Sequence, residues 1–242
     1  MKTIGVIPAR WGSTRFEGKV LAPLAGKPMV QHVWERVKGS ALLDDVLIAC
    51  DDRRVYTAAK NFGANVVLTS SEHPSGTDRI AEAVEDLDVD VVINIQGDEP
   101  LIQPQIIDAL AEALQNDSAS VMATVIKLFG KDEDVTDPNI VKVVVDQFQY
   151  ALYFSRSVIP YNRDGQDMSY YKHLGLYAYR KDFLLMYRNF EPSRLESIEK
   201  LEQLRVLEAG YRIKTVVTDV ETCGVDTPED LIKVEARLKE LT

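Results

Sequence analysis

Three cations, two hydroxyl groups and two glycines lie close together near the start of the chain. The segment from Arg10 to Lys19 also contains Ser13 and Arg15. Small residues let backbone N–H groups approach phosphate oxygens, and arginine and lysine add charge-assisted hydrogen bonds. The segment has neither the GxGxxG pattern of a dinucleotide-binding fold nor the GxxxxGK[ST] pattern of a P-loop. We expect a phosphate-binding loop of another kind, and a solvated basic loop is the alternative that spacing alone leaves open.

Two carboxylates could hold a hard cation near such a loop. Asp98 stands in Gln96-Gly97-Asp98-Glu99-Pro100, directly after an apolar run, and Asp226 stands two residues ahead of Pro228. Mg²⁺ is usually bound by one or two carboxylates together with substrate phosphates, so Asp98 is a candidate ligand. Spacing alone favours a different role for Asp226, because either it or Thr227 could cap a helix that Pro228 opens.

Three further polar groups each allow two interpretations. The segment Ser75-Gly76-Thr77-Asp78-Arg79 could contact the edge of a nucleobase, or its hydroxyls could simply cap a helix. His173 and Tyr177 lie at even spacing on one face of an expected strand, where they could bind a ligand or form a half-buried aromatic surface. Glu202 and Gln203 lie in an amphipathic helical pattern, and periodicity alone makes them ordinary exposed residues.

Strands and helices alternate in the first half of the chain, and they must position these residues. We expect strands over 3–8, 46–50, 65–69 and 89–95, and helices over 28–38, 53–62, 78–87 and 105–114. This order predicts a parallel sheet with right-handed crossovers and helices on both faces, and the continuous apolar strands fit burial on both faces. Ligands bind outside the carboxyl ends of such strands, where the basic loop and Asp98 fall.

The pattern changes in the second half. We expect strands over 119–128, 140–146, 149–154, 173–180 and 213–217, and helices over 197–208 and 228–241. Because few helices separate the first four of these strands, we expect an antiparallel layer or subdomain joined to the parallel sheet. The segment 160–169 could be a mobile loop or an interface arm.

Charge and composition exclude several classes of protein. The 242 residues include 28 Lys and Arg against 38 Asp and Glu, a formal net charge of −10 that disfavours nucleic acid and anionic membrane as partners. Residues 1–38 nevertheless carry seven cations and two glutamates, a local excess of +5 suited to a small anion. Cys50 and Cys223 form no metal-binding pattern. The start of the chain turns polar too early for a signal peptide, so we expect a cytoplasmic protein without membrane insertion.

In their order along the chain, these motifs resemble the 3-deoxy-manno-octulosonate (Kdo) cytidylyltransferases, also called CMP-Kdo synthetases. The segments that carry the resemblance are Ile7–Arg10, Ser13–Arg15, Gly18-Lys19, Ser75–Arg79, Gln96–Pro100, Ala151–Ser157, His173–Gly175, Leu201–Arg205 and Gly224–Asp230. Each segment alone is weak, but the set covers nearly the whole chain. The resemblance implies an α/β fold: a three-layer, mostly parallel, Rossmann-like nucleotidyltransferase sheet with a smaller β-rich subdomain.

The same resemblance implies the domain limits and the partners. Residues 1–242 would form a single nucleotidyltransferase domain, with 1–118 as the main CTP-binding part and about 130–190 as a β-rich subdomain for acceptor binding and dimerisation. The small-molecule substrates would be CTP and Kdo, the cofactor Mg²⁺ and the assembly a homodimer. The activity would be transfer of CMP from CTP to the anomeric hydroxyl of Kdo, with release of pyrophosphate, for lipopolysaccharide inner-core synthesis.

The resemblance also assigns roles to individual residues. The catalytic residues would be Lys19, Asp98 and Asp226, of which Asp98 and Asp226 would hold the metal. The nucleotide would be bound by Arg10, Ser13, Arg15, Lys19, Ser75, Gly76, Arg79, Gln96 and Gly97, and the acceptor by Arg156, His173, Tyr177, Glu202 and Gln203. These assignments replace the cap and surface interpretations of Asp226 and Glu202 on the strength of the resemblance alone.

Other functions remain conceivable from the sequence. Another sugar acid such as 8-amino-Kdo could be the acceptor. A non-catalytic CTP-binding regulator could dispense with Asp98 and Asp226, yet both are present. A nucleotide-sugar glycosyltransferase commonly has an Asp-x-Asp motif, which Gln96-Gly97-Asp98-Glu99 lacks.

The chain departs from the family pattern in three places. Glu17 and Val20 stand where the family usually has prolines, and Cys50 replaces a common threonine, which we interpret as a packing substitution. Loss of two prolines predicts a more flexible phosphate loop, and Glu17 adds negative charge near the triphosphate. We therefore expect weaker CTP binding than in a proline-bearing loop.

Overall fold

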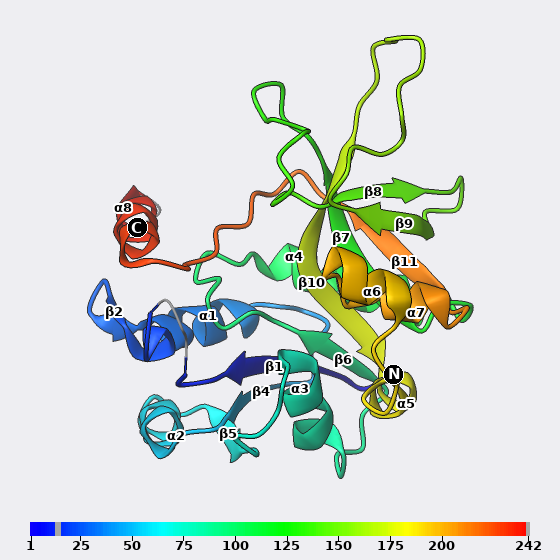
Figure 1. Cartoon of the computed structure of the whole chain (residues 1–242). Helices are drawn as coiled ribbons and strands as arrows, with labels where there is room; N and C mark the ends of the chain where they lie inside the picture. Colours follow the sequence, from blue (N-terminus) through cyan, green and yellow to red (C-terminus); the bar gives the residue numbers. More distant parts are fainter. Residues whose placement is uncertain (13–15, 241–242) are drawn as a thin grey trace.

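A mixed nine-stranded sheet lies at the centre of the molecule (Figure 1). The structure is a computed structural model that describes residues 1–12 and 16–240. The parallel part of the sheet has the order β6-β1-β4-β5 and consists of β1 (Thr3–Ala9), β4 (Asp45–Cys50), β5 (Asn65–Leu68) and β6 (Val91–Asn94). These are the four strands expected from the first half of the sequence. Their carboxyl ends share one edge of the sheet.

The strands of the second half continue the same sheet. They are β7 (Met122–Leu128), β8 (Lys142–Val145), β9 (Ala151–Ser155), β10 (Tyr171–Arg180) and β11 (Ile213–Val217). Strand β10 runs antiparallel between β6 and β7, β11 is parallel to β7, and β8 joins β10 to β9. The expected antiparallel strands thus join the parallel sheet, because β10 pairs directly with the parallel strand β6.

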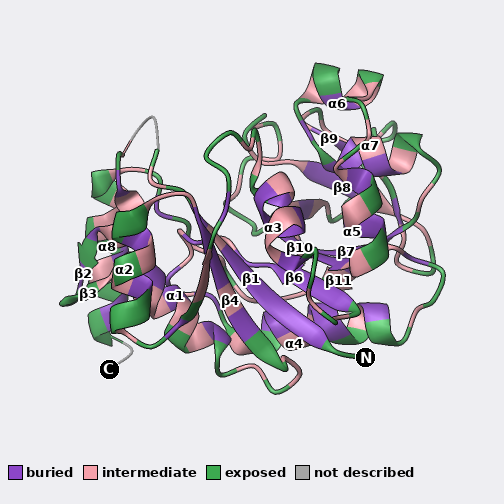
Figure 2. Ribbon diagram, turned by 90° about the horizontal axis from the view of Figure 1, so that it is seen from below, coloured by how far each residue is buried: buried purple, intermediate pink, exposed green. Residues whose placement is uncertain are grey.

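Helices cover both faces of the sheet. On one face α1 (Met29–Val37), α2 (Arg53–Asn61) and α4 (Pro104–Gln115) share a core with the strands; on the other lie α3 (Gly76–Val84), α5 (Lys181–Tyr187) and α7 (Gln203–Glu208). All four residues of β6 are buried, and Figure 2 shows buried strands between helices whose outer faces are exposed. The three-layer α/β architecture is confirmed.

Short elements that the sequence pattern did not predict position the basic loop and the C-terminal helix. They are a 3₁₀ turn (Lys19–Leu21) and the two-stranded sheet of β2 (Pro23–Leu24) and β3 (Lys27–Pro28). The C-terminal helix α8 (Pro228–Glu240) packs Val234 and Leu238 against Leu24 and Met29 in a small separate core. Val225 belongs to this core, so the loop ahead of α8 is held near the basic loop.

The helix expected over 197–208 is two helices. Helix α6 (Arg194–Glu199) ends at Lys200, whose φ of 56° and ψ of 49° are left-handed, and α7 begins at Gln203. Left-handed backbone breaks the helical hydrogen-bond pattern although the apolar periodicity continues through it. The prediction of one continuous helix is wrong, and the break places Glu202 and Gln203 at the start of a new helix.

Among residues 1–12 and 16–240, the structure shows no helix that is long and apolar enough to cross a membrane. The segment 156–170, between β9 and β10, projects from the body of the molecule (Figure 1).

Candidate active site

Two adjoining cavities open at the carboxyl ends of β1 and β6. The smaller, of about 320 Å³, is lined by Arg10, Lys19, Ser75, Gly76, Arg79, Gln96, Gly97 and Asp98, among others. The larger, of about 770 Å³, is lined by His173, Tyr177, Gln203 and residues of the loops beyond β7, α6 and β11. Gly76, Gln96 and Glu202 line both. Two ligands could thus bind next to each other, with these three residues between them.

Lys19 joins the two candidate carboxylates. Its Nζ lies 2.5 Å from Asp98 Oδ2 and 3.2 Å from Asp226 Oδ1, and it donates to the Val225 carbonyl at 3.0 Å. The Val225 N–H in turn donates to the Asp98 carbonyl at 2.8 Å. Residues that are 79 and 207 positions apart from Lys19 in the sequence are therefore brought into one charged cluster.

The structure distinguishes the two interpretations of Asp226. The Thr227 hydroxyl accepts a hydrogen bond from the Asp230 N–H at 3.3 Å and donates to the Asp230 carboxylate at 2.9 Å. Thr227 therefore caps α8, and the Asp226 carboxylate is left to contact Lys19. Asp98 lines the smaller cavity, and Asp226 lies next to it through their shared partner Lys19. Two such carboxylates fit Mg²⁺, which completes its shell with phosphate and water oxygens.

Arg79 is buried and its guanidinium is already engaged. It donates to Asp51 Oδ2 at 3.0 Å, to Thr69 Oγ1 at 2.6 Å and to the Ser70 carbonyl at 3.2 Å. Asp51 Oδ1 accepts from the Trp11 N–H at 2.9 Å. Arg79 thus contributes to the wall of the smaller cavity, and the pair that it forms with Asp51 anchors the base of the basic loop.

The remaining nucleotide-side residues shape the smaller cavity through the backbone. Ser75 caps α3: its hydroxyl accepts from the Asp78 N–H at 3.2 Å. At Gly97 a Cβ would lie 2.8 Å from the Pro8 carbonyl oxygen, so only glycine allows this turn to pack against the end of β1. Ser13 and Arg15 lie outside the described residues.

Glu17 forms a local cluster with Trp11 and Arg54. The Trp11 indole N–H donates to Glu17 Oε1 at 2.9 Å, and the Arg54 guanidinium lies 3.5 Å from the centroid of the Trp11 ring. The indole also packs against Gly18, where a Cβ would lie 2.7 Å from the ring. These contacts tie the end of the basic loop to α2 in place of the prolines that the family pattern has.

Replacing Glu17 by proline is expected to tighten CTP binding, because it restricts the unbound loop and removes a negative charge. Titration calorimetry with CTP measures the dissociation constant. Glu17→Gln separates the two causes, since it removes the charge and keeps an acceptor for the indole N–H. A dissociation constant unchanged in Glu17→Pro would contradict the prediction.

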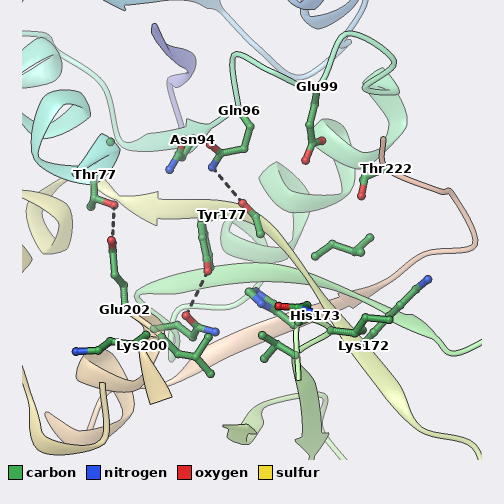
Figure 3. Close-up of a pocket in the computed structure, with 18 of the residues that line it drawn as sticks. Thr77, Asn94, Gln96, Glu99, Lys172, His173, Tyr177, Lys200, Glu202 and Thr222 are labelled. Atoms are coloured by element: carbon green, nitrogen blue, oxygen red, sulfur yellow. Dashed lines mark hydrogen bonds between the residues drawn. The ribbon is translucent and has the colours of Figure 1, made fainter. Parts of the chain in front are cut away.

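Three acceptor-side residues meet in the larger cavity. Thr124 donates its hydroxyl to the Leu176 carbonyl at 2.8 Å, so it can accept from His173 Nε2, 2.9 Å away. Burial lowers the pKa of His173 to about 3, so the imidazole is neutral at physiological pH. The Tyr177 hydroxyl contacts Gln203 Oε1 at 3.4 Å (Figure 3). His173 therefore offers a polar but uncharged group to a ligand.

Glu202 stands between the two cavities. It lines both, and the Thr77 hydroxyl donates to its Oε2 at 3.4 Å (Figure 3). Burial of the carboxylate raises its pKa, although the residue keeps solvent access. Periodicity alone predicts an ordinary exposed residue for Glu202, whereas the structure places it in the wall of both cavities.

Arg156 is not among the described residues that line either cavity. Its guanidinium donates to the carbonyls of Glu199 and Pro138, each at 2.8 Å. Those carbonyls precede Lys200 and Asn139, which line the larger cavity. In this state Arg156 holds two sides of the cavity rim together, and its direct contact with the acceptor stays a prediction.

Sequence reasoning missed several residues that line the two cavities or, like Asp51, pair with a lining residue. Asp51 directly follows β4, so inspection of the end of every expected strand would have found it. Asn94 is a polar residue within an apolar strand, and Glu99 lies inside a motif that drew attention only through Asp98. Burial, and to a smaller extent the negative charge of Asp98, raise the pKa of Glu99 to about 7. Lys172, which is paired with Glu133 at 2.5 Å, gave no sequence signal.

Comparisons with known proteins agree along the whole chain. A family model described as cytidylyltransferase matches residues 4–214. Proteins named 3-deoxy-manno-octulosonate cytidylyltransferase are 51% identical in Geotalea uraniireducens (99% of this chain, 100% of the relative) and 52% identical in Solibacter usitatus (98% and 95%). A mitochondrial protein of that name from Arabidopsis thaliana is 47% identical, over 99% of this chain and 84% of its own length.

Solved structures agree as well. A CMP:2-keto-3-deoxy-manno-octonic acid synthetase complexed with CTP superposes with a TM-score of 0.96 at 44% identity, over the full length of both chains. A cytidylyltransferase from Leptospira borgpetersenii, 17% identical over 99% of this chain and 87% of its own, has a TM-score of 0.68 and shares the fold.

Proposed function

Because the chain belongs to the 3-deoxy-manno-octulosonate cytidylyltransferase family, we propose that it transfers CMP from CTP to the anomeric hydroxyl of Kdo, with Mg²⁺, and releases pyrophosphate. The family predicted from sequence motifs is thereby confirmed, and the protein is a nucleotidyltransferase enzyme. The observation that carries the finer proposal is the pair of adjoining cavities, with the Lys19, Asp98 and Asp226 cluster at the smaller one.

The smaller cavity would hold the nucleotide. Arg10 and Lys19 line it, and they would place positive charge on the phosphates, together with Ser13 and Arg15 from the basic loop. In the structure Lys19 pairs with both carboxylates, and binding of the anionic nucleotide would let its ammonium turn to phosphate oxygens.

The metal proposal rests on the carboxylate pair. Asp98 and Asp226 would hold Mg²⁺, which would lower the pKa of the acceptor hydroxyl and neutralise phosphate charge. The acceptor oxygen forms a bond to the α-phosphorus, and the bond from that phosphorus to the bridging oxygen of the β-phosphate breaks. Arg10 and Lys19 would stabilise the charge on the departing pyrophosphate. No covalent enzyme intermediate is needed, because the two cavities let acceptor and nucleotide meet directly.

The wider biological predictions follow from family membership. The product would serve lipopolysaccharide inner-core synthesis in the cytoplasm. A homodimer formed through the β-rich segment would cover apolar side chains that one chain leaves exposed: Phe148, Leu152 and Tyr161 are 62%, 60% and 86% exposed. Among acceptors, no observation favours 8-amino-Kdo over Kdo.

Pyrophosphate release from CTP tests the function. We expect release with Kdo and Mg²⁺, and little without acceptor or after chelation of the metal. The 8-amino analogue of Kdo, assayed in parallel, identifies the preferred acceptor by its kcat/KM. Absence of release with every acceptor would exclude the proposed activity, and full activity in a chelator would exclude the metal requirement.

A further inference from the structure

Three buried side-chain atoms have no hydrogen-bond partner among the described residues, and all three belong to residues of the larger cavity. They are Asn94 Oδ1, Glu99 Oε2 and Gln203 Nε2. Figure 3 shows Asn94 and Glu99 beside this cavity. Buried polar atoms are nearly always paired, because an unpaired one loses its interaction with water and gains nothing in return. Their gathering at one cavity points to a ligand that completes their hydrogen bonds.

The arrangement defines the polarity of that ligand. Tyr177 contacts the Oε1 atom of Gln203, which leaves Nε2 as a donor, whereas Asn94 Oδ1 is an acceptor and the Glu99 carboxyl group keeps an acceptor oxygen with or without a proton. A matching ligand must donate at two places and accept at a third. A sugar rich in hydroxyl groups can do all of this, because each hydroxyl both donates and accepts.

Neither Asn94 nor Glu99 sits on a flexible segment. Asn94 ends β6 and pairs in register with Tyr177 of β10. Glu99 closes a turn in which its N–H donates to the Gln96 carbonyl at 3.2 Å and its carbonyl accepts from the Ile102 N–H at 3.0 Å. The same turn is packed against β1 at Gly97. The protein therefore keeps these acceptors in place before the ligand arrives, which is typical of a recognition site.

We propose that Asn94 and Glu99 are specificity-determining residues that each accept a hydrogen bond from a hydroxyl group of the sugar-acid acceptor. The inference rests on the proposed function, since it assigns the larger cavity to the acceptor. An acceptor analogue that lacks the matching hydroxyl leaves the Glu99 carboxylate buried and unpaired, so the site discriminates against it.

Kinetics of Glu99→Ala, with Kdo and CTP varied separately, test the proposal. Loss of a hydrogen bond that leaves a buried polar group unsatisfied costs about 1–3 kcal/mol, so we expect the KM for Kdo to rise by about 5- to 150-fold. The dissociation constant for CTP, titrated without Kdo, stays within about twofold. Glu99→Gln, which keeps one carbonyl acceptor, recovers part of the loss, and Asn94→Ala also raises the KM for Kdo. Glu112→Ala, an exposed change on α4, is the matched control and leaves both constants unchanged.

Stability provides a second readout. Because Glu99 Oε2 has no hydrogen-bond partner among residues 1–12 and 16–240, we expect Glu99→Ala to keep a melting temperature at or above that of the unmodified chain. A lower melting temperature would assign Glu99 a structural role and overturn the inference. An unchanged KM for Kdo in Glu99→Ala would also overturn the inference. If the unchanged KM came with a lower kcat and weaker CTP binding, it would show that Glu99 acts on the neighbouring Asp98 rather than on the acceptor. Absence of turnover in the unmodified protein would instead count against the proposed function.

Discussion

Asp98→Asn is expected to lower kcat by about 10²- to 10⁴-fold while the protein stays folded. Metal-assisted charge stabilisation contributes several kcal/mol to a transition state, and each 1.36 kcal/mol is a factor of ten in rate. Asparagine has nearly the same shape and still offers an oxygen to Lys19, but it carries no charge for a cation. The side chain of Asp98 is 29% exposed, so folding depends little on its pairing. Pyrophosphate release at saturating CTP and Kdo, over a range of Mg²⁺ concentrations, measures the effect.

The controls separate metal binding from nucleotide binding. Asp226→Asn should cause a loss of similar size, because its carboxylate belongs to the same cluster. Asp86→Asn, an exposed substitution, should leave the rate unchanged. CTP binding without metal should not weaken in Asp98→Asn, since the change removes negative charge beside the phosphates. Full activity in Asp98→Asn would show that this carboxylate does not hold the catalytic metal.

Asp51→Ala is expected to cause the largest loss of stability, on the order of 3–5 kcal/mol, and to weaken CTP binding. The side chains of Arg79 and Asp51 are 4% and 13% exposed, so the substitution leaves a buried guanidinium without its carboxylate. It also removes the acceptor of the Trp11 N–H, which positions the basic loop. Urea unfolding measures the change in the free energy of unfolding, and calorimetry measures CTP affinity.

A double variant tests whether the unpaired charge causes the loss. Asp51→Leu combined with Arg79→Met replaces the pair by apolar side chains and should recover much of the stability, since a buried pair contributes little net free energy. It should not recover CTP affinity, because the Trp11 N–H still lacks its acceptor. Glu85→Ala, which breaks the more exposed pair with Arg188, should cause a much smaller loss of stability than Asp51→Ala. If Glu85→Ala and Asp51→Ala lowered the free energy of unfolding equally, burial of the Asp51–Arg79 pair would not explain the loss of stability.

Local patterns in the sequence were sufficient for the elements of the parallel sheet. Continuous apolar runs and amphipathic periods depend only on neighbouring residues, so β1, β4, β5 and β6 and their crossover helices could be predicted. The order of the motifs along the chain was sufficient to predict the family, because many short segments that are weak singly are specific in combination. The same local patterns failed at the break of Lys200, where apolar periodicity continues although the backbone turns left-handed.

Contacts between distant residues could be decided only by the tertiary structure. Whether Asp226 or Thr227 caps α8 depends on Lys19, which reaches Asp226 because α8 packs against β2 and α1. Arg79 pairs with Asp51 because the first turn of α3 lies near the carboxyl end of β4. The unpaired atoms of Asn94 and Glu99 become visible only once burial around them is known. The sequence by itself determined the strands of the parallel sheet and the family. The tertiary structure decided which charges are paired with each other and which groups remain for a ligand, because pairing and burial depend on distance in space rather than along the chain.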